Sequence, residues 1–154
     1  MFSKHREMAR DIAESMNAHK FSLPFESYAR NLPIVELGQG DLDNLRCDVF
    51  AAEESGERSS RSTFQHSYKF RLGFRKKINV TSDEDVEAEL DKITVVVEEV
   101  LEFWKVHKPT NAHGALASFD TITPVGLADV RQKRLAVCEL ALTFNGTRDN
   151  RSAS

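Results

Sequence analysis

The sequence has little of what would mark a specialised class of protein. Only two of its 154 residues are cysteine, and neither belongs to a Cys-x-x-Cys pair, which excludes a disulfide scaffold. Cys47 and Cys138 both fall in apolar stretches, so we expect two buried free thiols.

The segment MFSKHREMAR lacks the apolar core of a signal peptide, and no apolar run approaches the about 18 residues of a membrane span. We therefore expect a protein made and used in a cytoplasm or in a particle assembled there.

Motifs for common chemistries are also missing. The sequence has no G-x-S-x-G, no H-E-x-x-H and no phosphate-binding G-x-x-x-x-G-K-[ST]. GQGDLD at residues 38–43 lacks the third glycine of a dinucleotide fingerprint, and the five histidines show no metal-ligand spacing. We predict no catalytic, cofactor-binding or metal-binding residues, no cofactor, and no enzymatic activity. A formal net charge of −3 argues against a dedicated nucleic-acid-binding domain.

What the sequence does contain is a set of strand patterns around one strong helix. A narrow apolar stripe predicts a short helix over residues 3–19, and Pro-punctuated extended chain follows at 21–37. Strands are predicted at 45–52, 115–123 and 134–144. The polar stretch at residues 52–62 is predicted to be a long loop.

The clearest strand covers residues 63–78. Phe64, Tyr68, Phe70, Leu72 and Phe74 alternate there with polar residues, which predicts a sheet with one buried and one polar face. Such a strand would be about 50 Å long, too long for a compact domain of this size. Part of it should protrude as an arm or bend sharply, with Gly73 as the candidate bend.

The clearest helix follows at residues 83–108. Thr81 and Glu84 fit a capping box, and Pro109 ends the pattern. Its apolar stripe comprises Val86, Leu90, Ile93, Val97, Val100 and Trp104.

The predicted order is α-β-β-β-α-β-β, and clustered strands indicate the α+β class. We expect a mixed, mostly antiparallel sheet of four to five strands, packed against the long helix and the short N-terminal helix, with a protruding hairpin or loop. Residues 1–144 should form a single domain, and residues 145–154 a polar C-terminal tail.

Two charged surfaces have no role in this core. Lys69, Arg71, Arg75 and Lys77 fall on one side of the long strand, while the long helix is mostly acidic outside its stripe. They are either two solvated faces, surfaces that meet between neighbouring subunits of a ring, or, for the strand, a contact to nucleic-acid phosphates. Candidate interface aromatics outside the core stripes are Phe2, Phe21, Phe50 and Phe119.

The layout resembles a family of tailed-bacteriophage proteins, the tail-terminator, tail-completion and neck proteins of the head–tail junction. The resemblance covers about residues 8–144 and departs from the family pattern at 112–124. It is carried by the N-terminal helix, YARNLP at 28–33, LRCDV at 45–49, the alternating strand that ends in RKK at 75–77, the acidic-capped helix, and VRQKR at 130–134.

The resemblance implies a structural virion protein, assembled in the host cytoplasm, that forms a hexameric ring. This ring would terminate the tail tube and join it to the head connector, with a passing contact to DNA in the lumen and no membrane partner. The alternatives are another neck or head-completion ring, or a nucleic-acid-binding α+β module. The residues expected at subunit or partner interfaces are Glu53, Glu54, Arg58, Arg61, Lys69, Arg71, Arg75 and Lys77.

Overall fold

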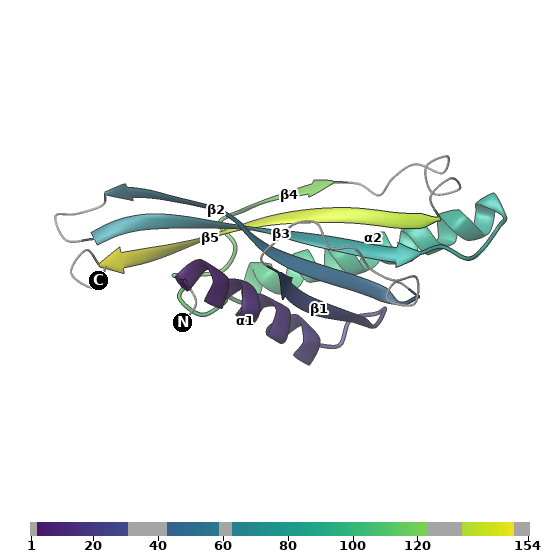
Figure 1. Cartoon of the computed structure of the whole chain (residues 1–154), viewed down its shortest axis with the longest axis horizontal. Helices are drawn as coiled ribbons and strands as arrows, with labels where there is room; N and C mark the ends of the chain where they lie inside the picture. The colour runs from purple at the N-terminus through teal and green to yellow at the C-terminus, as the bar shows by residue number, and fades with distance from the viewer. Residues whose placement is uncertain (1–2, 31–42, 59–62, 123–133, 150–154) are drawn as a thin grey trace.

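The computed structural model describes residues 3–30, 43–58, 63–122 and 134–149. They form an α+β fold in the predicted order, with one five-stranded sheet of strand order β1-β2-β3-β5-β4 (Figure 1). β1 and β2 are parallel and the other neighbouring pairs are antiparallel. The elements are α1 (Lys4–Ala18), β1 (Phe25–Arg30), β2 (Leu45–Arg58), β3 (Thr63–Lys77), α2 (Asp83–Val106), β4 (Ser118–Ile122) and β5 (Leu135–Asp149).

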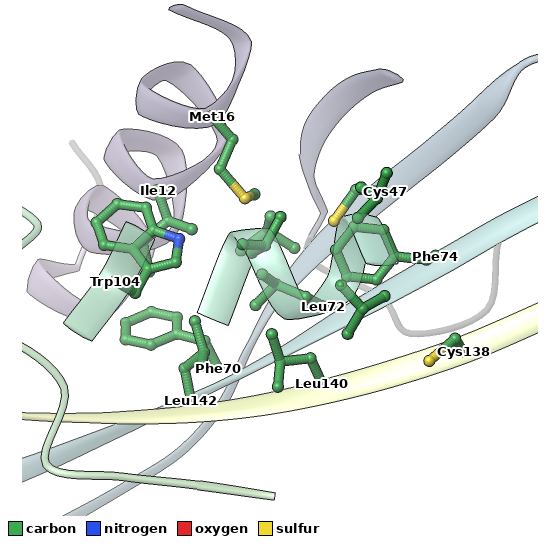
Figure 2. Packing of buried hydrophobic residues seen from close by; sticks show 14 of the residues in the cluster. Ile12, Met16, Cys47, Phe70, Leu72, Phe74, Trp104, Cys138, Leu140 and Leu142 are labelled. Carbon is green, nitrogen blue, oxygen red and sulfur yellow. The ribbon is translucent and has the colours of Figure 1, made fainter. Parts of the chain in front are cut away.

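The hydrophobic core lies between the two helices and one face of the sheet. Figure 2 shows Ile12 and Met16 of α1 and Trp104 of α2 directed toward Leu72 of β3 and Leu140 of β5. The alternating apolar residues of β3 are fully buried, as their period predicts: Tyr68, Phe70, Leu72 and Phe74. Because both helices pack on this face, the sheet's other face carries no helix among the described residues.

The two helices begin at serine caps. Ser3 Oγ accepts a hydrogen bond from the Arg6 N–H at α1, and Ser82 Oγ accepts one from the Asp85 N–H at α2. The prediction that Thr81 caps the long helix was therefore wrong by one residue. Ser82 has the extended backbone that a cap requires, with φ −77° and ψ 147°. α2 ends at Val106, just before the predicted limit.

The three long strands extend past the helices as an arm. Figure 1 shows the far ends of β2, β3 and β5 reaching beyond α1 on the side away from the start of α2. We define the arm as Glu54–Arg58 of β2, Thr63–Ser67 of β3 and Asn145–Asp149 of β5, which are in register with one another. Gly73 stays paired with Asp48 and Glu139, so the long strand continues as an arm without a break there.

The arm corrects two sequence-based expectations. The polar stretch predicted as a loop from residue 52 continues as strand to Arg58, and Asn145–Asp149, predicted as the start of a polar tail, continue β5. Their polar composition suggested loop and tail, but pairing with β3 satisfies the backbone groups on the side that faces β3. A register shift in β2 between Ala51 and Glu54 marks where the arm begins.

Candidate functional site

The basic row predicted on the long strand lies together on the helix-free face of the sheet. Lys69, Arg71, Arg75 and Lys77 occupy the odd positions of β3, opposite to the buried even positions. Arg71 is half exposed and lies 3.5 Å from Glu139 of β5. The row is therefore a continuous feature of one face, as its period predicts.

Sequence reasoning missed the group that organises this face, Asp48. Its carboxylate is almost fully buried and receives three guanidinium groups: Arg75 at 2.5 Å, Arg46 at 3.2 Å and Arg30 at 3.4 Å. These arginines come from β3, β2 and β1, so one carboxylate joins three neighbouring strands. Among the described residues, one carboxylate thus forms ion pairs with three arginines. The available signal was the polar alternation of Arg46 and Asp48 with the apolar Leu45, Cys47 and Val49.

Tyr28 covers the arginine cluster from β1. Its ring centroid lies 4.1 Å from the Arg46 guanidinium carbon and 5.3 Å from that of Arg30, both within the range of cation–π contacts. The Tyr28 hydroxyl donates to the Glu26 carboxylate, and this hydrogen bond is the main reason that the pKa of Tyr28 is raised. The stacking holds the arginines in fixed positions on the face.

The centre of this face is apolar. Phe50 is half buried on the same side as Arg46 and Asp48, and a Cβ placed on Gly73 would lie 3.9 Å from the Phe50 ring. The missing side chain of Gly73 thus leaves room beside Phe50, between Arg71 and Arg75 of the basic row. Half-buried Val137 and Ala141 are the β5 partners of Arg75 and Arg71. Phe50 remains a candidate interface aromatic.

The other predicted interface aromatics have different surroundings. Phe21 is 8% exposed and belongs to the core, where it stacks on Phe25, so its assignment to an interface was wrong. Phe119 is 45% exposed on β4, with the Lys105 ammonium 5.6 Å from its ring centroid. Phe2 lies outside the described residues.

The acidic residues of α2 lie on the opposite side of the domain. Val86, Ile93, Val97, Val100 and Trp104 are buried against the sheet. The outward side carries a stripe at helical spacing, in which every residue is exposed: Glu84, Glu87, Asp91, Val95, Glu98 and Glu102. We call these six residues the acidic stripe. It contains one large apolar side chain, Val95, which is 46% exposed.

The arm holds the remaining predicted interface residues. Glu53 is exposed in β2, and the backbones of Glu54 and Arg58 pair with Tyr68 and Phe64 of β3. Arg61 lies outside the described residues. Within the described ranges, β1 pairs with β2 no further than Phe50, and β4 pairs with β5 no further than Thr143. Both outer edges of the arm therefore lack a described strand partner.

The described residues offer little chemistry beyond charge. They contain no group of three or more His, Cys, Asp or Glu residues that could hold a metal ion. Burial raises the pKa of the Cys138 thiol to about 11 and that of Cys47 well above its ordinary value, so neither forms a thiolate nucleophile near neutral pH. Both thiols are buried and free, as the sequence predicts. No described helix has the length and apolar character needed to span a membrane.

A surface groove lies between α1 and β1. It has a volume of about 430 Å³ and is lined by Arg6, Arg10, Asn17, Tyr28 and Arg30, among others. The Asn17 side chain, which lines the groove, donates to the Ser27 carbonyl at 3.0 Å and accepts from the Ser27 N–H at 2.7 Å. These bonds fix α1 to the edge strand.

No protein-family model and no curated protein sequence matches this chain.

Proposed function

We propose that this chain is a structural subunit of a ring that closes the head-proximal end of a bacteriophage tail tube and joins it to the head connector. The family resemblance suggests the setting, and the arm is the observation that supports an assembly role. A strand edge presents unpaired N–H and C=O groups to any chain that can align with it. The arm has such edges on β2 and on the part of β5 beyond Asn145, within the described part of the chain. The Asn145 carbonyl itself accepts a hydrogen bond from the His113 N–H at 2.7 Å.

The composition of the arm suits a segment that becomes ordered by pairing with another chain. The three strands carry Glu54–Arg58, Thr63–Ser67 and Asn145–Asp149, which are mostly polar. A polar ribbon contributes little apolar burial of its own and is marginally stable without a partner. Strand addition to its edges would supply main-chain hydrogen bonds, with side chains setting specificity. The partner chain is a neighbouring subunit or a tube or connector protein.

An arm-deletion variant tests the proposal. Glu54 and Tyr68 are a facing pair, so an Asn-Gly turn can replace residues 55–67 and close a shorter hairpin. We expect this variant to fold, because the core lies outside the arm, and to remain monomeric by mass photometry. The wild type should form closed rings, alone or on tail tubes.

The matched control keeps the strands of the arm except Thr63, the first residue of β3. Replacing residues 59–63 by Asn-Gly joins Arg58 to Phe64, which also face each other. This variant should assemble as the wild type does. A wild type that stays monomeric even with tail tubes present would overturn the proposed function, and an arm-deletion variant that still forms rings would overturn the role of the arm.

A further inference from the structure

We infer that the acidic stripe of α2 binds the basic face of the sheet in a second copy of this chain, so that neighbouring subunits join helix to sheet. The inference rests on the proposed function, because it names the contact that would close the ring sideways. It uses surfaces distinct from the edges of the arm.

The charges of the two surfaces are opposite and unevenly balanced. The acidic stripe has five carboxylates, and one of them, Glu102, forms an exposed ion pair with Lys105 at 2.7 Å. The sheet face has the basic row on β3 and, among the described residues, three arginines around the carboxylate of Asp48. Two such patches attract each other, whereas a contact between two acidic stripes or between two basic faces is disfavoured.

The two surfaces also match in length and in the place of their apolar residues. Lys69 to Lys77 spans eight strand residues, about 27 Å, and Glu84 to Glu102 spans eighteen helical residues, also about 27 Å. Near the middle of the basic row lie Gly73 and Phe50, and within the acidic stripe lies Val95. An apolar centre within a charged rim is the usual anatomy of a protein interface. Val95 would pack beside Phe50 in the space that Gly73 leaves.

The fold prevents the two surfaces from meeting within one chain. The inward side of α2 packs on the helix-covered face of the sheet, so the acidic stripe and the basic face point in opposite directions. A contact between them must join two copies head to tail. Head-to-tail contacts form a closed ring when the rotation between subunits closes. The inferred contact therefore produces the type of assembly that the proposed function requires.

Charge reversal on each surface tests the contact. The sheet variant is Lys69→Glu with Arg71→Glu, and the helix variant is Asp91→Lys with Glu98→Lys. Each variant alone should associate more than about tenfold more weakly than the wild type, because like charges then face each other. Mixing the two variants should restore rings, since every junction of an alternating ring again joins opposite charges. A chain carrying all four substitutions should also assemble.

The control reverses two acids of the same spacing on the other helix. Glu7→Lys with Glu14→Lys changes the net charge as the helix variant does, but both residues are exposed on α1. This control should form rings normally. Mass photometry and sedimentation velocity, at low and high salt, measure the assembly of every variant.

The outcomes separate this inference from the proposed function. Rings that form equally well in the wild type and in both variants would overturn the inference and leave the proposed function standing. A monomeric wild type would overturn both. If only the sheet variant loses assembly, mixing does not rescue it, and it also loses salt-dependent binding to duplex DNA, the basic face binds nucleic acid instead and the inference is wrong.

Discussion

β2, β3 and β5 each have one half that the helices cover and one end that belongs to the arm. These two regions carry different side chains. In the covered half, residues such as Val49, Leu72 and Leu140 are fully buried under the helices. In the arm the register between strands continues, yet the described helices do not reach it (Figure 1). Main-chain pairing sets the path of both halves, and the hydrophobic core described above lies in the covered half. This difference is the reason why we propose that the arm contacts other chains.

The largest expected difference is between core and arm substitutions. Phe74→Ala removes a fully buried ring and should lower the free energy of unfolding by about 3–5 kcal/mol. Ser67→Ala in the arm removes a 3.1 Å side-chain hydrogen bond to Asn145 and should cost about 0.5–1.5 kcal/mol. Urea unfolding at a concentration where the protein is monomeric measures both. Equal costs would contradict the distinction between the two halves.

A second test concerns the polar face of the covered half. Asp48→Asn leaves three arginines without their shared negative charge, and we expect a loss of about 3 kcal/mol, the lower end for a buried pair, because Arg30 and Arg75 reach solvent. Glu139→Gln is the control. Its contact with Arg71 is exposed, so its cost should be about 0–1 kcal/mol. A similar small loss for Asp48→Asn would mean that the cluster is not a structural unit.

A third test addresses Gly146, where β5 enters the arm. A Cβ at this position would lie 2.7 Å from the carbonyl oxygen of Asn111 and 3.1 Å from the Tyr68 ring. Gly146→Val should therefore destabilise the protein by about 1–3 kcal/mol through overpacking. Gly114→Ala, where a Cβ would meet nothing within 4 Å, should change stability far less. Thermal unfolding of the two variants measures whether the close approach at Gly146 makes a side chain there destabilising.

The smallest expected effect is the pH dependence of the contact between Glu89 and Lys76. The Lys76 ammonium donates to Glu89 at 2.9 Å, and this hydrogen bond is the main reason that the pKa of Glu89 is lowered. A carboxyl whose folded pKa lies below its unfolded value stabilises the fold above the unfolded value, and loses that effect as pH falls through the folded pKa. Lys76→Met should therefore cost at most about 1 kcal/mol near pH 7.

The measurement for this contact is a pH series of urea unfolding. The stability difference between the wild type and Lys76→Met should stay constant above the ordinary Glu pKa of 4.5 and shrink below it. Lys92→Met, which removes the more exposed 3.4 Å contact to Glu89, is the control and should give a smaller difference. A difference that grows as pH falls would contradict the assignment.

Much of the covered half could be predicted from the sequence. The alternation in β3 gave the buried and polar faces correctly, and the apolar stripe of α2 identified the residues that pack on the sheet. The position of the basic row on one side of β3 followed from the strand's period of two residues. These are local patterns, in which each side chain's direction depends on its own strand or helix. The short N-terminal helix was placed correctly for the same reason.

The arm and the arginine cluster could not be predicted in this way. Glu54–Arg58 and Asn145–Asp149 have compositions typical of loops and tails, and they become strands because β3 lies between them. Asp48 meets arginines from three strands, two of them distant in sequence. Such contacts depend on strand order and register, which local periodicity does not contain.

The sequence by itself determined the α+β class, the order of the elements, and which faces of β3 and α2 are apolar, since these follow from periods of two and 3.6 residues. The tertiary structure alone decided that β5 lies beside β3, that polar segments extend both into an arm, and that Asp48 joins three strands. It also placed the acidic stripe and the basic face on opposite sides of the domain. The physical reason is that long-range pairing satisfies backbone groups and charges that no neighbouring residue can reach.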